Sequence, residues 1–521
     1  MALELQNLAD KKQRLVACDT STFSGVDGSY RYFVRRLKVN SFRHIRDLEI
    51  EFVHPVTVLS GTNKIGKTSL LLLIACSFER FMKVDSTSPA GQLREHTWSD
   101  VLAFTTHENP GQDYSYELDW RVGTSNRTGE GKRLAKSRAW SGLGKRSADV
   151  SRINAKIRDR QVRFIDLERV LPGRSFSNAL YRKANAATAE RLDAEIEQAF
   201  AYVFGMETVE LSEVGVHINK NCFLISPPGE SYSSYNAASG EEAVIYLLKD
   251  IIECPNNSLI LVDEIEAGFH PHVQRRLADL IQYISWRDKK QFIITTHSPT
   301  LLSAFPGASR RFVEKVGDQY RVINRISQQA ARSKMDAFGY PLYRLYCEDE
   351  LAQFIINKAL VKLTENYPHF QKLVDVIRSG PANEVKNDYE RHKRNFPQYR
   401  NQVGYCGVFD GDHKDHPRYS GYFENPNEDI LFLYPYDAPE KFLVRAYLGP
   451  NPNAELAAAL QHSEHHALFQ LMVNLGLAAD SSDARSICYT AFEQSPEYAK
   501  HYRDLSAFLM RVATKYSSTQ E

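Results

Sequence analysis

The chain has 521 residues, and its 65 lysines and arginines nearly balance its 64 aspartates and glutamates, giving a formal net charge of +1. This length exceeds one ordinary hydrophobic core and predicts two or three domains. The balanced charge excludes binding to a polyanion through overall charge, so any nucleic-acid surface must be local. The seven cysteines include no Cys-x-x-Cys pair, which favours a reducing compartment and predicts a cytoplasmic protein. The longest apolar run, Leu70 to Cys76, is too short to span a bilayer, so we expect no membrane association.

The first part of the chain has the pattern of an α/β domain. After a polar leader over 1–29, residues 30–42 and 47–61 read as strands, and the second ends at a glycine turn that opens an apolar helix over 68–81. Strand followed by loop and helix is the start of an α/β unit.

Two further apolar strands are predicted much later, over 258–266 and 291–298, with a helix between them over 272–285. Short, fully apolar strands indicate a parallel sheet that is covered on both faces. The residues between these strands and the first helix form an insertion, about 85–225, in which 188–204 has helical spacing.

The later part of the chain reads as a second α/β domain. Residues 341–361 are predicted to form a strand followed by a helix, and the segment from 451 onward reads as helical. We therefore predict a leader over 1–29, a first domain over 30–330, a second domain over 340–450 and a helical C-terminal region over 451–521.

The segment GTNKIGKT, Gly61 to Thr68, is a complete phosphate-binding loop with a predicted strand before it and a helix after it. Gly61 and Gly66 allow backbone N–H groups to approach phosphate oxygens at a helix N-terminus. Lys67 would reach the β and γ phosphates of ATP, and the Thr68 hydroxyl would be a ligand of Mg²⁺. The predicted nucleotide-binding residues of this segment are Gly61, Asn63, Lys64, Gly66, Lys67, Thr68 and Ser69.

The segment LILVDEIE places two carboxylates at the end of an apolar strand. Asp263 is placed to bind the magnesium of ATP, and Glu264 is placed to polarise the attacking water.

Together with NAASGEEAVIYLL and FIITTHSPTLL, these motifs resemble the nucleotide-binding head of the ABC superfamily, in the branch shared with chromosome-maintenance (SMC-like) and OLD-type (overcoming lysogenization defect) ATPases. The resemblance covers roughly Tyr30 to Ile326. It implies an ABC-type P-loop ATPase head with a short helical insertion, and a homodimer in which two heads enclose two ATP molecules.

The resemblance also implies roles for individual residues. Asp263 would bind magnesium, Glu264 would be the general base, His297 would sense the γ-phosphate and Arg43 would contact the nucleotide. The signature segment of one head, 237–241, would cap the ATP held by the other through Ser239, Gly240 and Glu241. Relatives usually carry a serine where this chain has Ala238.

A second group of carboxylates follows the first domain. Glu348 comes at the end of RLYCE, and Asp410 and Asp412 come at the end of YCGVFDGD. Carboxylates at the ends of neighbouring strands would offer hard oxygen ligands to Mg²⁺ or Mn²⁺, which suits phosphodiester cleavage. Glu440 and Lys441 are possible further members, whereas His413 and His416 are read as a solvated loop.

This second group resembles the TOPRIM domain of topoisomerases, primases and OLD-type nucleases. Glu348, Asp410 and Asp412 would then be metal-binding and catalytic residues. The sequence departs from that family in two places: Asp349 stands where a glycine is usual, and Ala352 stands where a second acidic residue is usual.

A basic stretch inside the insertion suggests DNA as a partner. Residues 127–163 contain twelve lysines and arginines and three acidic residues, with Trp140 among them. Such a stretch would follow phosphates without reading bases, although a charged loop without ligand is an equal alternative.

Two functions remain open from the sequence. In the first, an ATP-regulated head dimer, or a higher oligomer, controls metal-dependent nucleic-acid cleavage by its own TOPRIM-like domain. In the second, the TOPRIM-like domain is degenerate, and the protein is an ATPase that controls a separate nuclease, similar to the ATPase subunit of two-component Septu-type systems. Both resemblances imply bacterial defence against phage.

Overall fold

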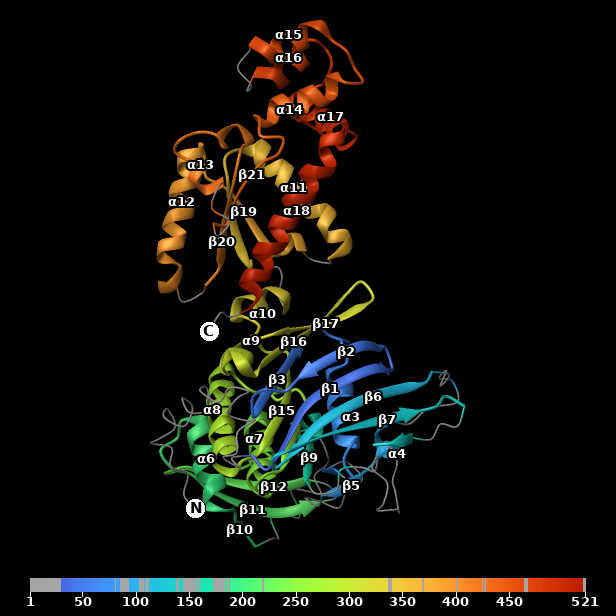
Figure 1. Cartoon of the computed structure of the whole chain (residues 1–521). Coiled ribbons are helices and arrows are strands. Elements are labelled where there is room, and N and C mark those ends of the chain that lie inside the picture. The colour runs from blue at the N-terminus through green and yellow to red at the C-terminus, as the bar shows by residue number, and fades with distance from the viewer. Residues whose placement is uncertain are drawn as a thin grey trace. The chain divides into compact units, whose positions relative to one another are not determined.

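The computed structural model describes residues 30–79, 81–84, 93–102, 107, 112–136, 140–143, 157, 160–171, 182, 185, 188–217, 220–335, 340–367, 370–399, 402–423, 425, 428–462 and 467–518 (Figure 1). The predicted leader, 1–29, lies outside these residues. The chain divides into two compact units, Met1–Gln328 and Gln329–Gln520. Each unit is described by itself.

The first unit is built around a mostly parallel sheet of eight strands. Its neighbours β16, β3, β15, β14, β9 and β4 run parallel, and the edge strands β17 and β5 are antiparallel. In sheet order the strands are β17 (Gln319–Asn324), β16 (Arg310–Val316), β3 (Val56–Gly61), β15 (Gln291–Thr296), β14 (Leu259–Val262), β9 (Val162–Ile165), β4 (Phe81–Lys83) and β5 (Arg94–His96). The prediction of a parallel sheet assembled from distant segments is confirmed.

An antiparallel sheet of five strands forms the second layer of this unit. Its order is β2 (Ile45–Glu51), β1 (Tyr32–Phe42), β6 (Tyr114–Val122), β7 (Ser125–Arg133) and β8 (Trp140–Gly142). A smaller antiparallel sheet contains β10 (Glu190–Arg191), β11 (Glu210–His217), β12 (Lys220–Ser226) and β13 (Tyr232–Ser233).

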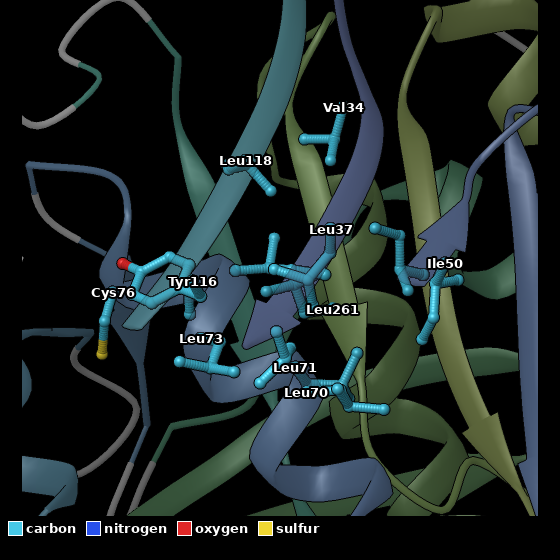
Figure 2. Close-up of a cluster of buried hydrophobic side chains, with 14 of the residues drawn as sticks. Val34, Leu37, Ile50, Leu70, Leu71, Leu73, Cys76, Tyr116, Leu118 and Leu261 are labelled. Atoms are coloured by element: carbon cyan, nitrogen blue, oxygen red, sulfur yellow. The ribbon is translucent and has the colours of Figure 1, made fainter. Parts of the chain in front are cut away.

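The helix after the phosphate-binding loop, α3 (Lys67–Cys76), lies within the main core of the first unit. Figure 2 shows its leucines Leu70, Leu71 and Leu73 beside side chains of β1, β2, β6 and β14. A helix that is apolar on all sides must be buried on all sides, which explains why α3 sits among strands of both large sheets. This packing holds the loop that precedes α3 in a defined place.

The remaining helices of the first unit follow the sheet strands. They are α4 (Trp98–Val101), α6 (Ala194–Phe204), α7 (Ser239–Ile252), α8 (Pro271–Asp288) and α9 (Pro299–Ser303). Helix α6 packs against α7 and α8. The helices predicted over 68–81, 188–204 and 272–285 are confirmed as α3, α6 and α8, although α3 and α6 are shorter than predicted.

Two parts of the sequence interpretation need correction. The single strand predicted over 47–61 is two strands, β2 and β3, which belong to different sheets. Pro55 lies between them along the chain, and because it has no N–H to donate to a neighbouring strand, it interrupts the extended segment. The insertion contributes a strand to the centre of the parallel sheet, β9, which pairs with β14. This strand has only four residues and includes Arg163, so its hydrophobic pattern was too short to stand out.

The second unit contains a parallel sheet of four strands in the order β19 (Val374–Arg378), β18 (Tyr343–Cys347), β20 (Gly404–Phe409) and β21 (Ile430–Phe432). Its helices are α10 (Gln328–Met335), which begins at the boundary, α11 (Glu350–Asn366), α12 (Ala382–Asn395), α13 (Ser420–Phe423), α14 (Pro439–Leu448), α15 (Ala454–His462), α16 (Leu468–Asn474), α17 (Ser481–Glu493) and α18 (Pro496–Ser517).

The last helix, α18, packs on the sheet of the second unit. The Tyr343 hydroxyl donates to Leu509 O at 3.2 Å, and the Tyr516 hydroxyl donates to Tyr405 O at 3.3 Å. The helical character predicted from 451 onward is confirmed, but α18 is part of the core of the second unit, a contact that no local pattern indicates.

Candidate functional site

The phosphate-binding loop has the backbone that its glycines predict. Gly66 has a φ of 97°, in the left-handed region, and immediately precedes α3. At Gly61 a Cβ atom would lie 2.3 Å from the carbonyl oxygen of Val313, so no larger residue fits. Asn63 and Lys64 are exposed at the tip of the loop. The loop therefore presents backbone N–H groups and the N-terminus of α3 to solvent on one side.

Lys67 lies folded back against this loop. Its Nζ donates to Gly61 O at 3.0 Å and to Thr62 O at 3.1 Å. Burial lowers the pKa of Lys67 to about 8, although the carboxylates of Glu264, Asp263 and Glu266 act in the opposite direction. An incoming phosphate would replace the two carbonyl acceptors with negatively charged oxygens.

The pKa of Lys67 predicts how ATP binding depends on pH. Protonated Lys67 is the form that pairs with phosphate, and in the free protein it loses its proton as pH rises through about 8. ATP affinity should therefore be highest below pH 8 and fall by up to about tenfold per pH unit above it. Calorimetric titration between pH 6.5 and 9.5 measures this. Lys67→Ala should bind ATP too weakly to detect throughout, and a flat profile in the unsubstituted protein would contradict the assignment.

Asp263 is connected to the phosphate-binding loop and to the neighbouring strand. Its Oδ2 accepts the Thr68 hydroxyl at 2.8 Å, and its Oδ1 accepts the Thr295 hydroxyl at 2.5 Å. The Thr295 oxygen in turn accepts the backbone N–H of Glu264 at 2.8 Å. Parallel pairing of β14 with β15 brings these residues to one edge of the sheet. The Thr68 hydroxyl and the Asp263 carboxylate are hard oxygen donors, so the pair fits Mg²⁺.

Thr295 was not selected from the sequence, although it stands two residues before His297 in a recognised motif. Replacing it with valine removes the hydroxyl at nearly constant volume and leaves Asp263 Oδ1 and the Glu264 N–H without this partner. We expect kcat/KM for ATP to fall by about 10- to 100-fold and the free energy of unfolding to fall by about 1–3 kcal/mol. Steady-state ATPase kinetics and thermal unfolding measure the two effects.

A matched control is Thr57→Val, a buried strand threonine whose hydroxyl donates to His54 O at 3.3 Å, away from the carboxylates. It should leave kcat/KM unchanged. Equal losses in both variants would mean that Thr295 has only a packing role.

Glu264 and His297 face each other across the same sheet edge. His297 Nε2 lies 3.7 Å from Glu264 Oε1, and both side chains are partly exposed. Glu264 has a φ of 45°, unusual for a residue other than glycine, so its backbone is held in a constrained turn. The backbone N–H of His297 donates to the carboxylate of Glu266. Glu264 and His297 are therefore close to each other at the sheet edge that carries Asp263.

Arg169 was missed by sequence reasoning. It is buried and lies in a short 3-10 helix, Leu167–Val170, after β9. Its guanidinium donates to Asp263 O at 3.1 Å and to Glu264 O at 2.7 Å, so it holds the backbone of the acidic pair. Burial lowers the pKa of Arg169, with nearby carboxylates acting against that effect. Only the tertiary fold brings this part of the insertion to the site.

Arg43 lies beside the start of α3. Its Nη1 donates to the Ser69 hydroxyl at 3.2 Å, and its backbone has a φ of 51°. The structure thus places both predicted nucleotide-contacting residues, Arg43 and Ser69, next to the phosphate-binding loop.

The predicted signature residues begin helix α7. Glu241 Oε2 accepts the Ala238 N–H at 3.0 Å, and its Oε1 accepts the Tyr232 hydroxyl at 2.7 Å. Gly240 packs so closely that a Cβ there would lie 2.7 Å from Gly268 O. In the described part of this single chain, no hydrogen bond joins Ser239, Gly240 or Glu241 to the phosphate-binding loop.

A cavity of about 350 Å³ adjoins the Thr68–Asp263 pair. Lys83 lines it, with its Nζ 2.7 Å from Asp166 Oδ2 and 3.7 Å from Glu168 Oε1. The site therefore has space beside the residues that fit magnesium.

The second unit brings the other predicted carboxylates to the end of its sheet. Glu348 follows β18 and Asp410 follows β20, and these two strands are parallel neighbours. The Asp410 N–H donates to Glu348 Oε1 at 2.9 Å. Asp412 lies in the short turn after Asp410 and is exposed.

Asp410 is buried among other carboxylates. Burial raises its pKa well above the usual range, and the charges of Glu348, Asp349, Asp412 and Glu440 raise it further. Its Oδ1 is buried and has no hydrogen-bond partner in the described part of the chain. A proton or a cation would satisfy this oxygen, and carboxylate oxygens are the kind of ligand that Mg²⁺ and Mn²⁺ prefer.

His413 belongs to this cluster, contrary to the interpretation that it is part of a solvated loop. Its Nε2 lies 3.2 Å from Glu348 Oε2 and 3.9 Å from Asp412 Oδ1. The hydrogen bond to Glu348 raises the pKa of His413. Within the described ranges, no three His, Cys, Asp or Glu side chains are arranged so as to hold a metal ion.

The two departures from the TOPRIM pattern have structural roles. The Asp349 carboxylate caps α11 by accepting the Ala352 N–H at 2.8 Å. Ala352 is fully buried in that helix. Ala352 therefore supplies no carboxylate oxygen, and one oxygen of Asp349 is engaged by the helix cap.

Three of the six described basic residues of 127–163 are buried and so do not form a phosphate-binding surface. Arg160 is buried and donates to Ser258 O and Gln291 Oε1, and Arg163 is paired with Asp250. Arg133 is also buried. These three residues therefore do not belong to the local positive patch expected from the sequence, whereas Arg127, Lys132 and Lys136 are exposed. The other basic residues between 137 and 158 lie outside the described residues.

A known protein family matches the part of the chain that contains the first site. Residues 56–303, from β3 to the end of α9, match the protein-family model "AAA domain, putative AbiEii toxin, Type IV TA system". The first unit has the fold of a P-loop ATPase. This match includes the phosphate-binding loop, the Asp263–Glu264 pair and His297, whereas Arg43 precedes the matched residues.

One curated relative and two solved structures illustrate what the ATPase domain is similar to. The Septu protein PtuA of Bacillus thuringiensis is 23% identical over 299 residues, which cover 52% of this chain and 73% of PtuA. The SMC head domain from Thermotoga maritima is 15% identical, with a TM-score of 0.34, over 56% of this chain and 98% of that structure. A Smc head domain derived from Pyrococcus furiosus, bound to the C-terminal domain of ScpA, is 13% identical, with a TM-score of 0.35, over 56% of this chain and 96% of that structure.

None of the described helices is both long enough and apolar enough to cross a bilayer.

Proposed function

We propose that the protein is an ATP-binding and ATP-hydrolysing head dimer that regulates metal-dependent nucleic-acid cleavage by its own second unit, in bacterial defence against phage. The observation that carries the ATPase part is the hydrogen-bonded series from Thr68 through Asp263 and Thr295 to the Glu264 N–H. The cluster around Asp410 supports the cleavage part.

The residues of the first site have separate roles in ATP hydrolysis. Lys67 and the loop N–H groups bind the phosphates, and Thr68 and Asp263 would hold Mg²⁺. Glu264 accepts a proton from the attacking water, and Arg169 and Thr295 keep its backbone in position. Mg²⁺, when bound, neutralises phosphate charge during the reaction.

A second copy of the chain would complete this site. Ser239, Gly240 and Glu241 start α7, where backbone N–H groups can meet an anion. In one chain they have no hydrogen bond to the described phosphate-binding loop, so their proposed contact with ATP requires the partner head. Ser239 would take the place of the usual serine at Ala238.

In the second unit, Glu348, Asp410 and Asp412 would hold Mg²⁺ or Mn²⁺ at the sheet edge. A bound divalent ion activates water and stabilises charge on a phosphodiester. Because His413 contacts Glu348, it would have to release that carboxylate when the ion binds.

One alternative has specific support. Ala352, and the contact of His413 with Glu348, favour a second unit that does not cleave and a protein that controls a separate partner nuclease. The name of the relative PtuA, a Septu protein, is consistent with either role in defence.

A plasmid-cleavage assay separates the two functions. We expect the purified full chain to nick supercoiled DNA with Mg²⁺ or Mn²⁺, and we expect added ATP to change the rate. Absence of cleavage in both metals, together with co-purification of a nuclease from the native host, would favour the partner function.

A further inference from the structure

A second cavity lies on the antiparallel sheet of the first unit. Its volume is about 450 Å³, within the range of small-ligand sites. Its walls come from the start of β1, the end of β6, the start of β7 and the residues after β2. Arg43, beside the phosphate-binding loop, follows the opposite end of β1, so this cavity is separate from the ATP site.

The cavity contains more positive than negative charge. It is lined by four arginines and two carboxylates, Glu51 and Asp119. One arginine, Arg36, is paired with Asp119 at 2.7 Å. Arg35 donates to Asn126 Oδ1 at 3.0 Å, and neither Arg35 nor Arg127 has an acidic partner in the part of the chain that the structure describes. Two guanidinium groups are therefore available to an anion.

One aromatic side chain of the cavity wall is almost fully buried. Trp120 lines the cavity and is only 9% exposed. Its indole Nε1 is buried and has no hydrogen-bond partner among the described residues.

From the volume and the two arginines without an acidic partner, we infer that this cavity binds a small phosphate-bearing anion about the size of a mononucleotide. Guanidinium groups bind phosphate oxygens through paired hydrogen bonds. The N–H₂ group of Asn126 offers a further donor, and Phe33 provides an apolar wall, whereas the Thr128 hydroxyl donates to Asp119 Oδ1 at 2.8 Å. A hollow between strands suits one compact ligand better than the repeated phosphates of a duplex, which need an extended surface.

The test is calorimetric titration of the full chain carrying Lys67→Ala, so that the ATP site does not contribute. The probes are AMP, inorganic phosphate and a short DNA duplex. We expect AMP, or phosphate itself, to bind at one site per chain. The double variant Arg35→Gln/Arg127→Gln in the same background should lower that affinity at least about tenfold, because each arginine provides a charged hydrogen bond.

Lys38→Gln/Lys132→Gln is the matched control, since it removes the same charge from the same two strands outside the cavity. The affinity of this control variant for AMP or phosphate should be unchanged. If the double arginine variant fails to fold, the exposed single variant Arg127→Gln replaces it, with an expected loss in the same direction. Equal loss in the control, binding of the duplex alone, or no binding of AMP and phosphate would each overturn the inference.

Discussion

Glu264→Gln should bind ATP normally, hydrolyse it at least about 100-fold more slowly, and accumulate as an ATP-bound dimer. Glutamine preserves the size of the side chain but cannot accept a proton from water. The turn that holds residue 264 depends on backbone contacts to Thr295 and Arg169, which the substitution leaves in place. Hydrolysis would therefore fail without loss of the binding site.

Two measurements check this result. Single-turnover hydrolysis gives the rate, and light scattering after size-exclusion chromatography with ATP gives the mass. Glu253→Gln, an exposed position just after α7, is a control with the same chemical change and should hydrolyse ATP normally. Normal turnover in Glu264→Gln would remove the general-base assignment, and an unchanged mass would count against the head dimer.

Asp410→Asn should abolish metal-dependent cleavage and also change how metal affects stability. In the unsubstituted protein, a divalent ion at 100 times its Kd should add about 2.7 kcal/mol to the free energy of unfolding. The asparagine variant should lose this gain. Without metal it should be more stable than the parent, because one member of a buried group of carboxylates no longer repels Glu348 and its neighbours.

Thermal unfolding of the second unit in chelator, Mg²⁺ and Mn²⁺ measures these effects beside the plasmid assay. Asp415→Asn, exposed in the same loop, is the control and should behave like the parent. If metal stabilises both the parent and Asp410→Asn equally, the ion binds elsewhere. If metal stabilises only the parent but DNA stays uncut, the site binds metal without cleaving, which favours the alternative of a separate partner nuclease.

Sequence reasoning was most successful where chemistry depends on a short segment. The loop from Gly61 to Thr68 needs glycines for its backbone and a lysine and threonine for phosphate and magnesium, so it can be recognised from eight residues. Asp263 and Glu264 follow four apolar residues, and Asp410 follows a similar run. In each case one strand and its following turn place the side chain at a sheet edge.

Other features depend on segments far apart in the chain. Arg169 and β9 lie in the insertion, and only the pairing of β9 with β14 brings them to Asp263. The contact of His413 with Glu348 requires β18 and β20 to be neighbours, and the arginine cavity requires β1, β6 and β7 to meet. Local residue pattern specifies backbone conformation and side-chain chemistry, whereas burial and long-range hydrogen bonding determine which of those side chains act together.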